Sequence, residues 1–132
     1  MSVPAAVLAL LEGAVTPVYD GEVPLNDKGR PTSDRYAVLY ADAGTRNSDD
    51  LPLTADRHVY RWQVTSVGED RRQAEWVAVR CRDALLDQPL TVAGWELTPV
   101  THESSSVIRR DDDLPGDPLF FAVDTYSLTA TR

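Results

Sequence analysis

The sequence predicts an α+β fold, with a mixed, mostly antiparallel β-sheet and two helices packed on one face, in the order α-β-β-β-α-β-β-β. The β-branched and aromatic residues that favour strands are concentrated in residues 35–41, 58–67 and 119–131. Helical spacing of apolar residues is confined to a short N-terminal segment and to residues 69–87, so helices and strands do not alternate. The 132 residues fit one domain, and we expect residues 1–132 to form it.

The N-terminal segment reads as a short helix followed by two short strands. Ser2 is a capping residue, Pro4 suits the first turn, and Gly13 is a typical C-terminal stop. Turn residues then interrupt the chain repeatedly, which leaves room only for strands at 18–19 and 23–25.

Three longer segments are expected to form the centre of the sheet. Residues 35–41 are apolar almost throughout, which is typical of a strand covered on both faces. Residues 58–67 alternate between two faces, which predicts a strand with one buried face. Residues 119–131 form a long final run of strand-forming residues that we place in the middle of the sheet.

Between these segments the pattern predicts weaker strands and two long irregular segments. Strands are expected at 90–92 and 95–103, and Pro99 makes the second an edge or bulged strand. Residues 42–56 and 104–118 are rich in Asp, Gly, Pro and Ser, and we expect them to form mobile loops. The second loop is expected to project, because its middle is too charged to pack.

The second helix is predicted over residues 69–87 and has the clearest amphipathic pattern in the chain. Its apolar face carries Ala74, Val77, Ala78, Cys81, Ala84 and Leu85. Trp76 and Val79 widen the apolar arc beyond a simple stripe, so Trp76 is expected to face a partner. The candidate subunit or partner interface on this helix is Arg71, Arg72, Glu75, Trp76, Arg82 and Asp83.

Composition excludes several classes of function. The chain carries 13 basic and 21 acidic residues, and a net charge of −8 disfavours a surface that holds phosphates. The longest apolar stretch, residues 3–11, is too short to cross a bilayer, so no membrane partner is expected. The single cysteine, Cys81, cannot form an internal disulfide, and a reducing compartment is the simplest context.

No catalytic arrangement stands out. His58 and His102 lack the i, i+4 spacing of a helical zinc pair, and we expect both rings to be satisfied within strands. Cys81 lies on the apolar helical face, where a thiol behaves as a core residue. The glycines are dispersed and form no nucleotide-binding fingerprint. The sequence therefore predicts no catalytic residue and no cofactor.

The acidic clusters are also weak candidates for metal ligands. Residues 111–113 with Asp117 lack the alternating ligand positions and the closing Glu of a calcium loop, and Asp49 with Asp50 reads the same way. Asp124 lies within the last predicted strand, where we expect a rim carboxylate that pairs with an arginine or meets a neighbouring subunit. No metal site is predicted.

The strand-to-helix joint carries a family resemblance. YRWQVTSVG (60–68), followed by RRQAEWVA (71–78) and RCRDAL (80–85), resembles the tail terminator, or tail completion, proteins of long-tailed bacteriophages, of the minor tail protein U type. The likeness is strongest to phages of actinobacterial hosts. The order of elements also agrees over most of the chain, from the N-terminal helix to the long last strand.

The resemblance implies an α+β subunit that forms a hexameric ring on the head-proximal end of the tail tube. Such a ring stops tube polymerisation and joins the tail to the head-tail connector or stopper, while DNA passes through without specific binding. It implies a virion protein that is assembled in the host bacterial cytoplasm. An acidic lumen would repel phosphates. The candidate lumen- or partner-facing residues are Asp49, Asp50, Arg109, Arg110, Asp111, Asp112, Asp113 and Asp117.

Three other functions stay open on the sequence. A head-tail connector or stopper on the capsid side would have similar size and element order, and would purify with heads. A small host-directed binding module would be a stable monomer. A small enzyme would need a nucleophile and base that the sequence does not display.

Overall fold

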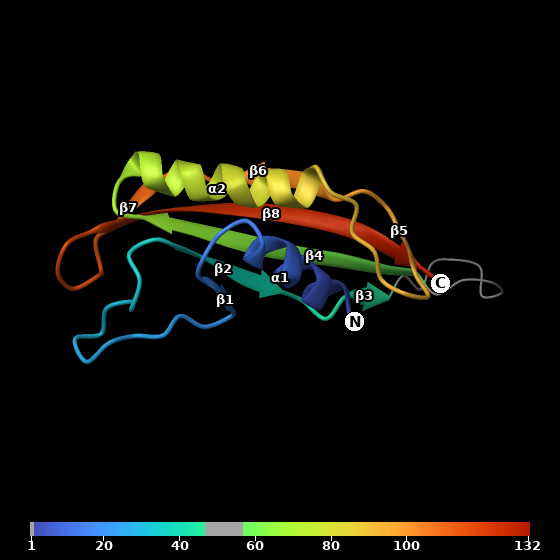
Figure 1. Cartoon of the computed structure of the whole chain (residues 1–132), viewed down its shortest axis with the longest axis horizontal. Coiled ribbons are helices and arrows are strands. Elements are labelled where there is room, and N and C mark those ends of the chain that lie inside the picture. Colours follow the sequence, from blue (N-terminus) through green and yellow to red (C-terminus); the bar gives the residue numbers. More distant parts are fainter. Residues whose placement is uncertain (1, 47–56) are drawn as a thin grey trace.

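The computed structural model describes residues 2–46 and 57–132 and confirms the predicted fold class. These described residues form two helices and eight strands, and the two long strands run side by side (Figure 1). The elements are α1 (Val3–Glu12), β1 (Val18–Asp20), β2 (Tyr36–Ala41), β3 (Thr45–Arg46), β4 (Arg57–Gly68), α2 (Arg71–Leu86), β5 (Glu96–Leu97), β6 (Thr101–Ser105), β7 (Arg109–Asp111) and β8 (Leu119–Thr131).

Both helices begin at the capping residues that physical chemistry favours. The Ser2 hydroxyl accepts a hydrogen bond from the Ala5 amide at 3.2 Å, and α1 ends at Gly13. The Asp70 carboxylate accepts from the Gln73 amide at 2.8 Å, while the Gln73 side chain accepts from the Glu69 amide at 2.7 Å. This reciprocal pair satisfies two amides that would otherwise lack partners and fixes the start of α2.

The sheet is mixed, with one parallel pair and otherwise antiparallel pairs. Its order is β1-β2-β4-β8-β5, with β3 paired to β4 and with β6 and β7 paired to β8. β1 and β2 are parallel. The central ladder joins β4 to β8 from Arg57 opposite Thr131 to Gly68 opposite Phe120. β8 therefore lies inside the sheet, as predicted.

The two faces of the sheet are covered differently. Both helices pack on one face, here called the helix face, where Val7, Val77, Cys81, Trp62 and Tyr126 belong to one continuous core. The opposite face, here called the outer face, carries a smaller cluster of Tyr36, Val38, Val67 and Leu119. Alternation along each strand sends neighbouring residues to opposite faces, so one strand contributes to both clusters.

Several predicted boundaries need correction. Residues 23–25 form no strand, because Leu25 makes only an isolated bridge to Pro31. Residues 90–92 form no strand either, because 90–91 are irregular and Val92 makes only an isolated bridge to Trp95 across a turn at 93–94. The strand predicted at 95–103 is divided into β5 and β6, with Pro99 in the interruption.

The two predicted irregular segments are partly ordered into strands. β3 lies within 42–56, and the rest of that segment, including Asp49 and Asp50, lies outside the described residues. Within 104–118, β7 pairs with the first residues of β8, and β6 extends to Ser105. The main chain of β8 offers hydrogen-bond partners to β6 and β7, and this pairing does not depend on the identity of their side chains.

Candidate assembly interface

The exposed side of α2 presents an aromatic ring between two arginines. The Trp76 side chain is 44% exposed, a large fraction for an indole. The guanidinium carbon of Arg35 lies 5.0 Å from its ring centroid, and that of Arg80 lies 5.4 Å from it. Cation–π attraction of this kind contributes about 0.5–1 kcal/mol at exposed sites. The Trp76 ring is therefore exposed and flanked by two cations.

Arg80 is itself fixed in place. Its Nε and Nη2 atoms both donate to the carbonyl oxygen of Ala14, at 3.2 and 3.1 Å. One guanidinium thereby ties the end of α1 to α2 and flanks the Trp76 ring. Val79, one helical turn from Trp76, is 38% exposed and extends the apolar surface.

The other predicted residues of α2 divide into an exposed set and one half-buried residue. Arg71 and Glu75 form an exposed ion pair with 3.2 Å between Nη1 and Oε2, an interaction worth little in water. Arg72 and Asp83 are exposed. Arg82 is half-buried, so it differs from the rest of the predicted set.

A buried carboxylate on β8 holds edge strand β6 to the sheet. Asp124 is 1% exposed, and its Oδ1 atom lies 2.8 Å from His102 Nε2 and accepts from the Ser105 hydroxyl at 2.6 Å. The expected rim position of Asp124, with an arginine or a neighbouring subunit as partner, is wrong. The register places Asp124 opposite Val64, on the helix face, where water is excluded. The expectation that the His102 ring is satisfied is confirmed.

The hydrogen bonds and burial in this region are those of structural groups. Ser105 bonds to Asp124 and not to His102, so the three residues form no relay from nucleophile to base. Burial raises the pKa of Cys81 to about 12. A thiol with that pKa stays protonated at neutral pH and is a poor nucleophile. Burial also raises the pKa of Tyr126.

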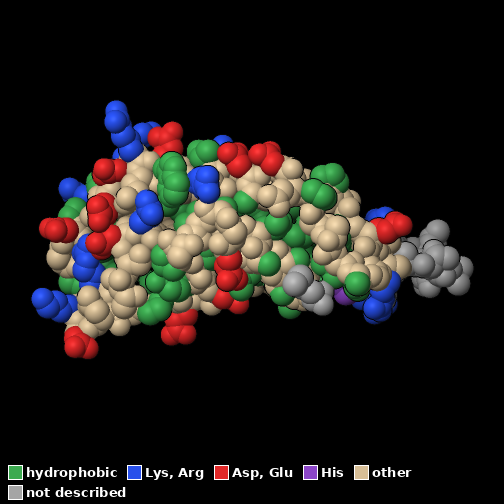
Figure 2. Space-filling model, in the orientation of Figure 1, with side chains coloured by type: hydrophobic (Ala, Val, Ile, Leu, Met, Phe, Trp, Pro, Cys, Tyr) green, Lys and Arg blue, Asp and Glu red, His purple; other side chains and the backbone are tan. Residues whose placement is uncertain are grey.

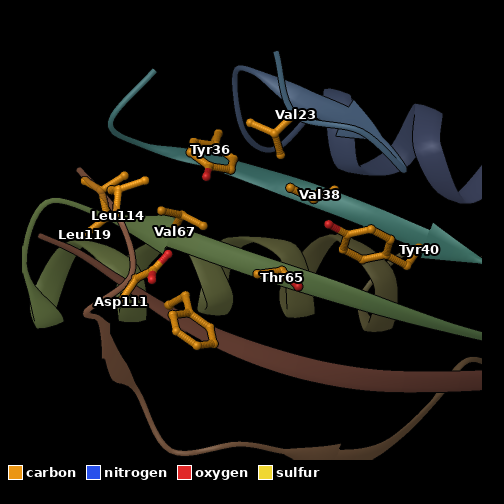
Figure 3. A pocket seen from close by; sticks show the side chains of 10 residues that line it. Val23, Tyr36, Val38, Tyr40, Thr65, Val67, Asp111, Leu114 and Leu119 are labelled. Carbon is orange, nitrogen blue, oxygen red and sulfur yellow. The ribbon is translucent and has the colours of Figure 1, made fainter. Parts of the chain in front are cut away.

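The outer face carries a groove of about 170 Å³ between the first strands and the β7–β8 turn. Its floor is mainly apolar, and in Figure 3 Val38, Val67 and Leu119 line it, with Tyr40 at one end and Asp111 at the other. Burial, more than the neighbouring charges, raises the pKa of Tyr36 to about 12. Tyr40 is 45% exposed. The outer face therefore keeps apolar surface that no helix covers.

The charged residues of the β7–β8 turn are gathered at the Asp111 end of the groove on the outer face. Arg110 Nε lies 2.6 Å from Asp112 Oδ1, and Asp111 Oδ1 accepts from the Asp113 amide at 3.1 Å. Contrary to the expected projection, the turn packs: Leu114 contacts the outer cluster. Arg30 also donates to the carbonyl oxygens of Pro115 and Asp117. Asp112, Asp113 and Asp117 stay exposed.

The sequence reasoning missed Arg35, Arg80 and the anchor made by Asp124. Arg80 follows Trp76 by four residues, and this spacing alone places both on one side of a helix. Arg35 approaches Trp76 from the start of another element, and no local pattern signals that contact. The described residues contain no group of three or more His, Cys, Asp or Glu residues suited to a metal ion. No helix in the described part is long and apolar enough to span a bilayer.

Comparison with known proteins identifies the class as structural proteins of bacteriophage tail assembly. The family described as "Tail completion protein gp17" matches residues 3–117, and the chain belongs to this family. It is thus a structural component of the phage virion and not a member of an enzyme family. No curated protein matches the chain.

Two solved structures resemble the chain. A chain of the virion of a native gene transfer agent particle superposes with a TM-score of 0.59 at 19% identity, covering 96% of this chain and 85% of that chain. At this identity the likeness shows the fold. A second solved chain matches at 19% identity with a TM-score of 0.48, over 98% of this chain and 96% of that chain, too weakly to support a conclusion.

Proposed function

We propose that the protein assembles as a hexameric ring on the head-proximal end of the tail tube. The ring stops tube polymerisation and provides the surface to which the head-tail connector or stopper attaches. The observation that carries this proposal is membership of the tail completion family over residues 3–117. Exposed apolar side chains that a monomer would not need support the ring, above all Trp76 and Val79 on α2.

Net charge supports a path for DNA through the ring. A charge of −8 per subunit gives a hexamer a strongly negative field, which disfavours phosphate binding to its lumen. DNA would then pass without specific contacts, and the partners would be the tail tube protein, the connector or stopper, and further copies of this chain. The site of action is the head-tail interface of the virion, after assembly in the bacterial cytoplasm.

The proposal is tested by an assembly assay in a phage that lacks this protein. Tails from that phage should fail to join filled heads, and their tubes should vary in length or extend beyond normal tails. Adding the purified protein should restore joining, and negative-stain images should show six-fold density at one tube end only. Finding the protein on purified heads but not on purified tails would overturn the proposal in favour of a capsid-side connector or stopper.

A matched control keeps the assay specific. The Lys28→Glu variant changes charge on an exposed loop residue of the 26–30 turn, away from α2. It should restore joining as well as the unaltered protein does. Restoration by the unaltered protein with tubes still of uncontrolled length would refute the termination part of the proposal.

A further inference from the structure

We infer that the arginine-flanked tryptophan of α2 is the docking site for the acidic β7–β8 turn of a second copy of this chain. The Trp76 patch is defined as Arg35, Arg72, Trp76, Val79 and Arg80, and the acidic turn as residues 111–117. This inference rests on the proposed ring and names the contact between its subunits.

The Trp76 patch has the chemistry of a protein interface core. The five residues are all exposed, and the guanidinium groups of Arg35 and Arg80 flank the Trp76 ring. Tryptophan and arginine are the residue types most enriched among binding hot spots. Figure 2 shows hydrophobic side chains beside Lys and Arg side chains over the region of α2. On a chain with 13 basic and 21 acidic residues, a patch with three arginines favours an acidic partner.

The acidic turn supplies the complementary charge. It holds four aspartates in seven residues, and the side chains of Asp113 and Asp117 are exposed. The turn is held in shape by Arg30, which donates to the carbonyl oxygens of Pro115 and Asp117, while the Asp117 side chain stays exposed. A turn with a fixed backbone loses less conformational entropy on docking than a flexible one.

The positions of the two surfaces suit a contact between two copies. α2 covers the helix face, whereas Asp111 and Leu114 of the acidic turn line the groove on the outer face. The Trp76 patch and the acidic turn of one chain therefore lie on opposite sides of the sheet and can face different neighbours. A contact between two different surfaces of identical chains is heterologous, and such contacts close into rings when the rotation permits.

Cross-linking tests the contact directly, even where association is weak. The Val79→Cys and Asp113→Cys variants are purified separately, the second with an isotope label, and then mixed. The native thiol of Cys81 should not react, because this side chain is only 1% exposed. Disulfide-linked heterodimers should exceed both homodimers, and the double variant should give a ladder of higher species. The control replaces Asp113→Cys by Glu22→Cys, an exposed acidic position outside the turn. Heterodimer yields equal to this control would overturn the inference.

Charge reversal provides a second readout. Arg72→Glu should weaken the association at least about tenfold, the effect expected when one partner of a close interfacial charge pair is reversed. Asp113→Arg in the partner should restore it, whereas Glu22→Arg should not. The N-terminal turn of a helix tolerates Glu, so Arg72→Glu should leave folding intact. Raising the salt to about 1 M, where the Debye length falls to about 3 Å, should reduce heterodimer yield.

The inference and the proposed function fail in different ways. Normal capping of tails without the Val79–Asp113 cross-link would reject this contact and leave the ring in place. Efficient cross-linking with no effect on tail joining would support the contact and reject the proposed role.

Discussion

Asp124 is predicted to be the largest single polar contribution to the attachment of β6. In the folded chain the Asp124 carboxylate lies 2.8 Å from His102 Nε2 and 2.6 Å from the Ser105 hydroxyl. Replacing Asp124 by Ala removes this buried acceptor, so both side chains lose their hydrogen-bond partner. Hydrogen bonds to charged groups contribute about 1.5–3 kcal/mol each, so the loss of two should cost about 3–6 kcal/mol. At about 2–8 °C per kcal/mol for domains near this size, the melting temperature should fall by at least about 6 °C.

The matched variants separate the charge from the packing. Asp124→Asn keeps the shape and one acceptor and should cost about half as much, whereas Asp113→Ala on the exposed turn should change stability by less than about 0.5 kcal/mol. Urea unfolding gives the free energies, and amide hydrogen exchange should show the loss of protection concentrated in residues 101–105. A cost below about 1 kcal/mol for Asp124→Ala, or exchange that rises uniformly over the sheet, would refute the anchoring role.

Two further predictions concern close packing at the helix face. Gly68→Ala should destabilise the chain by about 3 kcal/mol in urea unfolding, because a Cβ atom there would lie 2.4 Å from the Ala74 amide nitrogen. The control is Gly13→Ala, whose Cβ would lie 3.5 Å from its nearest neighbour. Equal losses of unfolding free energy in the two variants would contradict the packing reason. The Cys81 thiol, with its pKa raised from 9.0 to about 12, should resist maleimide at pH 8 in the folded chain and react after denaturation. Because the folded pKa is the higher one, its contribution to stability is complete below pH 9 and is lost as the pH rises toward 12; pH-independent stability between pH 8 and 11 would contradict this reasoning.

The sequence predicted the fold best where a local pattern carries the physical cause. The alternation over residues 58–67 and the apolar spacing of residues 69–87 each report burial on one face, and β4 and α2 follow them closely. Ser2 and Gly13 bound α1 as capping chemistry predicts. In these cases the interaction that stabilises the element is made by neighbours in the sequence.

The prediction failed where the partner comes from elsewhere in the chain. Residues 109–111 are charged and read as loop, yet β8 is long enough to pair with three short strands in turn along its outer edge. Asp124 looked like a rim residue because its partners, His102 and Ser105, lie on a strand whose register could not be known. The Arg35 contact with Trp76 depends on the packing of α2 beside the start of β2.

The arrangement of Trp76 gives a physical reason for an exposed tryptophan in an assembly protein. An indole that is free to rotate would lose conformational entropy on docking, which opposes association. Here Arg35 and Arg80 already flank the ring in the single chain, and Arg80 is fixed by two bonds to Ala14. The cost of ordering is thus met during folding, and the remaining exposed ring area can stabilise the contact with a neighbour. The same guanidiniums keep the patch hydrated and positively charged, which limits docking to acidic surfaces.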